Sequence, residues 1–216
     1  DRTGNDYYTL SEGANQPLRR FARVGEADAE VSFAVIGDYG FDGAAEAAVA
    51  GLVASWNPNL VTTVGGNNYT SGAAATIDAN IGQYYQQYIG NYSGTYGPGA
   101  TTNRFFPALG DRDWDTAGAQ PYFNYFTLPG NERYYEFVAG AVHFFVLDSD
   151  SREPDGNSVT SAQAQWLRAE LNASASLFQV VLLQHAPYSS VAGHGSDATL
   201  QWPFQAWGAD LIVAGG

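Results

Sequence analysis

The segment Phe33-Ala34-Val35-Ile36-Gly37-Asp38-Tyr39-Gly40 joins a short apolar run to a carboxylate flanked by glycines. Four consecutive apolar residues followed by Gly-Asp are typical of a buried strand that ends at a polar corner. Similar runs recur at Leu60–Val64, Phe105–Leu109, Val180–Leu183 and Leu211–Ala214, and each ends at a glycine or polar residue. The sequence therefore predicts several short buried strands, each with a functional group or a tight turn at its carboxyl end.

Helical patterns fill the segments between these strands. Ala44–Trp56 carries Val49, Leu52, Val53 and Trp56 on one stripe, which we expect to face the core. Thr76–Ile89 carries Ile81, Tyr84, Tyr85 and Tyr88 at helical spacing, and we expect these side chains to pack in the core or on its flank. Thr160 and Gln163 have the spacing of a capping box at the start of a third helix.

The remaining apolar runs are Tyr134–Val138 and Val142–Leu147, which predict two strands turned by Ala139-Gly140. Strands alternating with helices predict an α/β fold. No repeat and no linker interrupts the pattern. We expect one domain over residues 31–216, preceded by an N-terminal extension over residues 1–30.

The composition suits a large globular domain and narrows its partners. The 216 residues are 45% hydrophobic and 14% charged, and their net charge is −13. All nine cationic side chains are Arg. A strong negative charge repels phosphodiester backbones and anionic membranes, so we expect no nucleic-acid partner. No stretch reaches the roughly 20 apolar residues of a membrane span, and without Cys there are no disulfides or thiolate metal sites.

Two features favour a secreted or extracellular protein. The chain opens at Asp1 without Met, which favours a processed or trimmed end. Three triplets match the N-glycosylation pattern, at Asn68, Asn91 and Asn172. Such triplets also arise by chance, so the localisation is an expectation.

Polar residues follow four of the predicted strands: Asp38, Tyr69, Asp111 and His185. Any one of them alone is more simply a turn or loop residue. Ligands of α/β proteins bind beyond the carboxyl ends of strands, where such corners converge. We therefore expect these four side chains to lie near one another.

The ordered motifs resemble the calcineurin-like metallophosphoesterase superfamily, and most of all its purple acid phosphatase branch. The similar segments are Phe33–Gly40, Val64–Tyr69, Leu109–Asp115, Gln184–Ser189 and Asp210–Gly215. The resemblance implies a layered sandwich of mixed β-sheets flanked by helices. It implies that Asp38 and Tyr69 bind one metal ion, and that Asp111 and His185 bind a second. It also implies a chain truncated at its C-terminus, before the last ligand motif of the family.

The centres of these motifs depart from the family. Gly66 stands in place of the Asp that bridges the two metals, Asp111 in place of an Asn ligand, and Arg112 in place of a His. Gly216 stands in place of the first His of the closing motif. Two divalent ions ~3.5–4 Å apart repel one another by on the order of 20 kcal/mol at an effective dielectric of ~20. Without the bridging carboxylate, we predict at most one weakly held divalent or iron ion and assign no catalytic residue.

Arg112 has two interpretations. Its guanidinium could bind a phosphate-like anion, or it could pair with Asp111 or Asp113 and seal the site. The second interpretation is the simpler one, and Arg112 remains a candidate substrate-binding residue.

Two functions stay open at this point. The leading hypothesis is a catalytically impaired module that binds or supports other molecules, as an extracellular homo-oligomer or assembly. The alternative is an active metal-dependent phosphomonoesterase or phosphodiesterase with an altered metal site.

Overall fold

The computed structural model describes residues 7–9, 20–22, 30–190 and 195–215, and their contacts group the chain into two units, Asp1–Glu30 and Val31–Gly216. In the first unit, β1 (Tyr7–Thr9) pairs antiparallel with β2 (Arg20–Ala22). The second unit holds every other helix and strand of the described chain. Gly216 lies outside the described residues.

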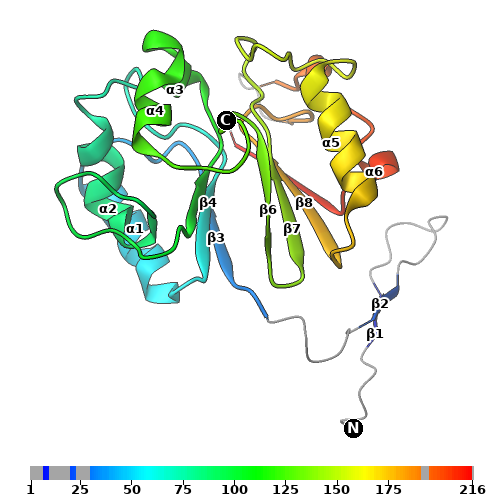
Figure 1. Cartoon of the computed structure of the whole chain (residues 1–216), viewed down its shortest axis with the longest axis horizontal. Coiled ribbons are helices and arrows are strands. Elements are labelled where there is room, and N and C mark those ends of the chain that lie inside the picture. Colours follow the sequence, from blue (N-terminus) through cyan, green and yellow to red (C-terminus); the bar gives the residue numbers. More distant parts are fainter. Residues whose placement is uncertain (1–6, 10–19, 23–29, 191–194, 216) are drawn as a thin grey trace, which may run out of the picture. The chain divides into compact units, whose positions relative to one another are not determined.

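Two sheets form the centre of the second unit (Figure 1). The first contains β3 (Phe33–Ile36), β4 (Leu60–Thr63) and β5 (Phe105–Pro107), all parallel and in that order. The second contains β6 (Tyr135–Ala139), β7 (Val142–Val146), β8 (Phe178–Leu183) and β9 (Leu211–Ala214). Its order is β6-β7-β8-β9, with β6 antiparallel to β7 and the other pairs parallel.

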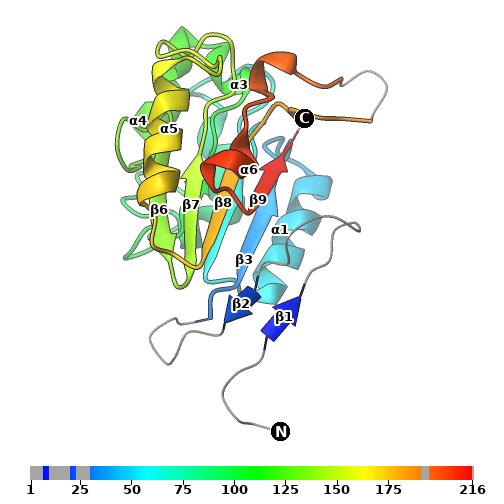
Figure 2. The same cartoon turned by 90° about the vertical axis from the view of Figure 1, so that its right-hand side faces the viewer.

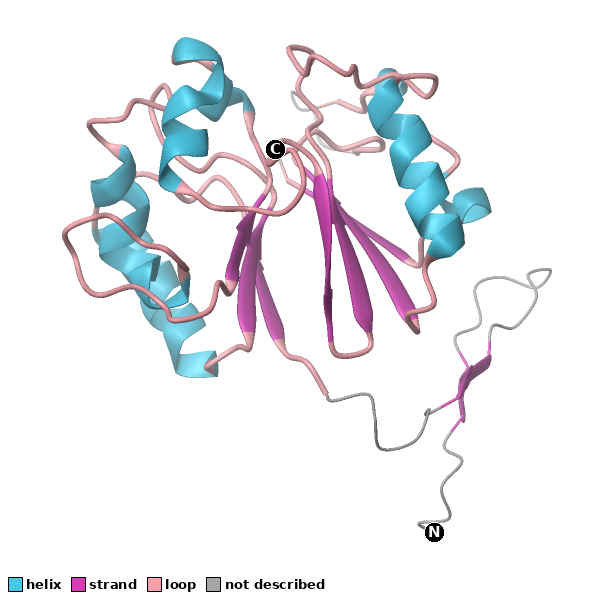
Figure 3. Cartoon of the chain, viewed as in Figure 1, coloured by secondary structure: helices cyan, strands magenta, loops and turns pink. Residues whose placement is uncertain are grey.

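Helices cover the outer face of each sheet (Figure 3). Beside the first sheet lie four α-helices: α1 (Ala44–Trp56), α2 (Gln83–Tyr85), α3 (Asp111–Trp114) and α4 (Gln120–Tyr125). The π-helical turn η1 (Asp78–Gly82) and the 3-10 turns η2 (Gln86–Tyr88) and η3 (Ala117–Ala119) accompany them. Beside the second lie α5 (Ala162–Ala173), η4 (Ala198–Leu200) and α6 (Phe204–Trp207). The second unit is a layered α/β sandwich, as the sequence predicted. No helix of the described residues is long and apolar enough to cross a membrane.

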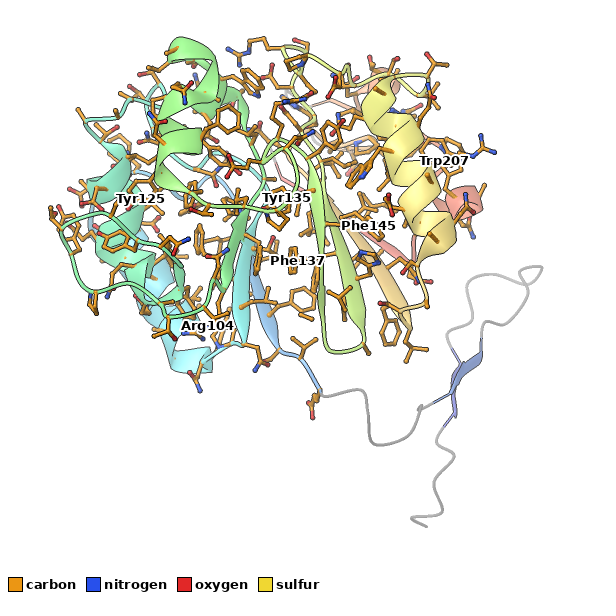
Figure 4. All side chains as sticks on the ribbon, viewed as in Figure 1. Arg104, Tyr125, Tyr135, Phe137, Phe145 and Trp207 are labelled. Atoms are coloured by element: carbon orange, nitrogen blue, oxygen red, sulfur yellow. The ribbon has the colours of Figure 1, made fainter. Side chains whose placement is uncertain are left out.

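Alternating side chains divide the second sheet between two cores. Phe144 of β7 belongs to the cluster between the sheets, whereas Phe145 belongs to the cluster under α5 and α6. Figure 4 shows Phe137 on the inner side and Phe145 on the side of α5. Phe137 stacks on Phe106 of β5, with ring centroids 3.7 Å apart, and thereby joins the two sheets. The period of two along each strand thus builds both cores.

The orientation predicted for α1 is wrong. Glu46, Ala50 and Val53 are its buried residues, while Leu52 and Trp56 are 52% and 60% exposed. Glu46 and Ser55 are the only residues of α1 that are not apolar or glycine, so its periodicity does not single out one face. The helix instead packs on its small residues and on Val53.

The predicted capping box is also wrong. The first turn of α5 is capped by Ser161, whose hydroxyl accepts a hydrogen bond from the Ala164 amide at 3.2 Å. Gln163 does not reach back to the cap, because its side chain exchanges two 2.9 Å hydrogen bonds with the backbone of Asp148. Gln163 therefore bonds to a distant backbone segment and not to the start of its own helix.

Candidate functional site

The sequence-predicted site residues surround one pocket at the carboxyl ends of the strands. The pocket has a volume of about 570 Å³, and its lining includes Asp38, Tyr69, Asp111, Arg112 and His185. Asp38 follows β3, Tyr69 lies in the loop after β4, Asp111 and Arg112 begin α3 after β5, and His185 follows β8. The topology therefore brings these five residues together from both sheets.

Asp38 and Tyr69 form one side of the pocket. The Tyr69 hydroxyl donates a 2.9 Å hydrogen bond to Oδ1 of Asp38. Burial, reinforced by this bond to a carboxylate, raises the pKa of Tyr69 to about 12, so the phenol keeps its proton at neutral pH. Asp38 and Tyr69, which were predicted to share a metal ion, are thus hydrogen-bonded to each other.

Gly66 lies against Asp38. Its φ is +64°, and a Cβ placed there would lie 2.3 Å from Oδ1 and 2.7 Å from Cα of Asp38. Contacts this short require a neighbour to move, and one of these neighbours is backbone. Asp38 therefore occupies the space into which a bridging side chain at position 66 would project.

Asp111 is fixed by Gln184, a pocket residue that the sequence interpretation missed. The Asp111 amide donates to Oε1 of Gln184 at 2.7 Å, and Nε2 of Gln184 donates to Oδ1 of Asp111 at 2.8 Å. The Arg112 amide donates to the same Oδ1 at 2.9 Å. The only sequence signal for Gln184 was its place between β8 and His185.

Arg112 lies at the solvent-exposed rim of the pocket, where it forms two long ion pairs. Its guanidinium lies 3.7 Å from Asp111 and 3.7 Å from Asp115, and its side chain is 45% exposed. It also lies over the Tyr69 ring, 5.7 Å from the centroid. Pairing with Asp111 was predicted, whereas pairing with Asp113 was not found because Asp113 points into the protein and is 1% exposed.

A second arginine, Arg152, holds the acidic rim together. It donates to both carboxylate oxygens of Asp150, to Asp115 and to the backbone oxygen of Asp111, each at 2.8 Å. These contacts keep the pKa of Asp150 below its usual value despite partial burial. The spacing of residues along the chain carries no signal for Arg152, since its contacts with Asp115 and Asp111 are formed only by the tertiary fold.

His185 is oriented by Ser149, which follows β7. The Ser149 hydroxyl lies 3.0 Å from Nδ1 of His185 and accepts a 2.9 Å hydrogen bond from its backbone amide. The two contacts fix the imidazole relative to the end of β8.

A buried polar layer lies beneath the pocket. Asn67 is fully buried; its Nδ2 donates to the Ala108 oxygen at 2.7 Å and to Asp113 at 2.6 Å, and its Oδ1 accepts from Thr63 and Tyr39. Burial raises the pKa of Asp113 to about 7, against the opposing effect of its hydrogen bonds. This layer connects the loops after β3, β4 and β5.

Asn68 extends the buried layer toward the helical turns. Its side chain is fully buried and bonds to Ala73, Thr76 and Asn80 at 2.8–2.9 Å. A buried and fully bonded amide is inaccessible to a glycosylating enzyme in the folded protein. The triplets that present an exposed Asn are those at Asn91 and Asn172.

The residues of the pocket do not fit a pair of bridged metal ions. Position 66 offers no donor, and Asp38, Asp111 and His185 each bond to a protein partner. Among the described residues, no group of three or more His, Cys, Asp or Glu is placed to hold a metal ion. Metal sites in proteins ordinarily supply three or four such donors.

No protein-family profile and no curated protein sequence matches this chain. Solved structures do match. The purple acid phosphatase PPD1 from yellow lupin (Lupinus luteus) seeds superposes with a TM-score of 0.65 at 14% identity, over 91% of this chain. The fold is that of the metallophosphoesterases. GAP50, described as the anchor in the inner membrane complex of Plasmodium, superposes with a TM-score of 0.56 at 16% identity, over 85% of this chain.

This metallophosphoesterase-fold chain is short beside its structural neighbours. It spans 40% of the lupin chain and 65% of the GAP50 chain. At such low identity the likeness extends to the fold, and the function has to be argued from the pocket itself.

Proposed function

We propose that this chain is a catalytically impaired metallophosphoesterase-fold module that acts by binding or by supporting an extracellular assembly. The observation that carries the proposal is Gly66, whose side-chain space is occupied by Asp38. Two-metal hydrolysis needs ions ~3.5–4 Å apart, and their repulsion is ordinarily offset by a bridging carboxylate. Among the described residues that line this pocket, none supplies a carboxylate in that position.

The condition of the rest of the site supports the same proposal. The loops around the pocket keep a fully buried polar layer, in which Asn67 alone bonds to four partners. A chain decaying at random would lose such a layer together with its ligands. GAP50, which is described as an anchor, offers a precedent for an anchoring role on this fold. The exposed Asn91 and Asn172 triplets favour an extracellular location.

The test is a hydrolysis assay with p-nitrophenyl phosphate and bis(p-nitrophenyl) phosphate, each with added Mn²⁺, Zn²⁺ or Fe²⁺ between pH 5 and 8. The matched control is the double variant Asp38→Ala, His185→Ala. We expect the two proteins to give the same background rate with every metal. A metal-dependent rate that the double variant abolishes would contradict the proposal and favour an active enzyme with an altered site.

A second candidate is binding of a phosphate-like anion at Arg112. Its ion pairs are long, its side chain is 45% exposed, and it lines the pocket beside Asp38, Tyr69 and His185. An arginine with loosely engaged donors can bind an oxyanion through paired hydrogen bonds. Inorganic phosphate, titrated by calorimetry against the chain and Arg112→Ala, tests this role. We expect weak binding that the variant loses, and equal heats from both proteins would exclude it.

A further inference from the structure

The solvent-facing side of α1 carries no charged residue. The only charged residue of α1 is Glu46, which is 3% exposed. The solvent-facing residues are Ala, Gly and Ser together with Val49, Leu52 and Trp56, which are 41%, 52% and 60% exposed. An exposed helix normally places charged residues toward water. This face of α1 is therefore unusual for a helix whose outer side meets only solvent.

Two sheet edges continue this side. Sheet order places β3 at the edge of the first sheet and β9 at the edge of the second, and no strand among the described residues pairs with their outer sides. Their sequences, Phe-Ala-Val-Ile and Leu-Ile-Val-Ala, contain no charge and no proline. Leu211 and Ile212 are 48% and 36% exposed. Figure 2 shows β9, β3 and α1 following one another across the same side.

Edges of this kind are usually blocked. Proteins protect a free strand with lysines, prolines, bulges or a covering element, because its backbone donors and acceptors otherwise pair with another chain. Neither β3 nor β9 carries such a protection in its own sequence. Val35 and Val213 remain half-buried beside the core between the sheets, so this core is not fully closed at the edge.

We propose that this side, formed by α1, β3 and β9, binds a second copy of the chain. The inference rests on the proposed function as an assembling module, and it names the surface and the partner. The net charge of −13 makes most contacts between two copies repulsive, because acidic surfaces would face each other. A contact across a two-fold axis places the uncharged residues of α1, β3 and β9 on both sides, so two copies approach here with less of that repulsion.

A stable contact needs both the helix α1 and the strand edges of the proposed surface. A stable interface buries about 800 Å² on each partner. The 13 residues of α1 span only ~20 Å, so the helix alone is too small. In the dimer, β9 supplies backbone hydrogen bonds and the stripe of α1 supplies apolar contact.

Sedimentation velocity of the purified chain between 1 and 100 µM tests the proposal. We expect a concentration-dependent species at twice the 23.1 kDa mass. Leu52→Glu and Ile212→Lys should each weaken the dimer at least tenfold, since they put a charge on both sides of the contact. Val159→Glu is the matched control, because Val159 is 46% exposed and lies in the loop before α5, outside α1, β3 and β9. Circular dichroism confirms that each variant is folded.

Two results would overturn the inference. One is a chain that remains monomeric at 100 µM. The other is a dimer that Leu52→Glu and Ile212→Lys weaken no more than Val159→Glu does. A monomer without hydrolysis leaves the catalytic impairment standing and removes only the second copy. A dimer with metal-dependent hydrolysis supports the binding of a second copy and contradicts the catalytic impairment.

Discussion

The rim of the pocket and the layer beneath it are built differently. At the rim, Asp38 and Arg112 are solvent-exposed, and the ion pairs of Arg112 are 3.7 Å long. Beneath it, Asn67 and Asp113 are almost completely buried and joined by a 2.6 Å hydrogen bond. The loops are thus positioned by buried amides and backbone groups. Side chains at the rim can therefore change while the architecture of the site persists.

The largest effect is expected in the buried layer. Asn67→Ala removes the partner of Thr63, Tyr39, Asp113 and the Ala108 oxygen, and leaves several of these groups unsatisfied. We expect a loss of about 3–5 kcal/mol in the free energy of unfolding, measured by urea denaturation. A loss below about 1 kcal/mol would mean that the layer does not hold the loops.

Restoring the missing carboxylate tests the rim directly. Gly66→Asp adds a Cβ 2.7 Å from the Cα of Asp38 at a φ of +64°. We expect a destabilisation of about 2–4 kcal/mol, from left-handed strain and overpacking, and no gain of hydrolysis.

Gly118→Asp separates the two causes. Gly118 has nearly the same φ, +62°, but a Cβ at this position would have no atom within 4 Å. Gly118→Asp should lower the free energy of unfolding by about 1 kcal/mol, from left-handed backbone strain alone. Equal effects of the two substitutions, or metal-dependent activity of Gly66→Asp, would contradict the crowding by Asp38.

The buried carboxyl of Asp113 predicts a pH dependence. Its pKa rises from 3.8 unfolded to about 7 folded, so the native state holds the proton more tightly. Its contribution to stability is complete below pH 3.8 and is lost as the pH rises through 7. Between these values the slope from this group is about −1.4 kcal/mol per pH unit. Asp113→Asn should flatten the stability profile between pH 5 and 7, and an unchanged slope would assign the effect to another group such as Glu46.

The smallest effect is expected for the exposed arginine of the rim. Arg112→Ala should change the free energy of unfolding by less than about 0.5 kcal/mol, because long ion pairs in water contribute little. Arg152→Ala should cost about 1–2 kcal/mol, since it leaves the nearly buried Asp150 without its cation. Thermal unfolding of the two variants distinguishes them, and a reversed order would show that Arg112 is structural.

Local patterns predicted much of the fold. Apolar runs located every strand of the second unit to within two residues, and Ala44–Trp56 and Leu211–Ala214 have the predicted bounds. The expected convergence of strand ends also placed Asp38, Tyr69, Asp111, Arg112 and His185 around one pocket. These features follow from the periodicity of apolar residues and from the common direction of parallel strands, and local sequence patterns predict both.

Other features depend on contacts between distant segments. Gln184 reaches Asp111 across 73 positions, and Arg152 reaches Asp115 across 37, so no local pattern reveals either contact. The burial of Asp113 beneath the loops was missed for the same reason. The face of α1 was assigned wrongly because its sequence is almost uniformly apolar.

The metal content of the purified chain decides whether the pocket has lost its metal pair. Elemental analysis should be made on protein produced with iron, zinc and manganese supplied together, before any chelator is used. We predict less than one metal ion per chain, since Gly66 offers no bridge and the remaining donors bond to protein groups. Close to two ions per chain would contradict the loss of the site and restore a metal-dependent hydrolase.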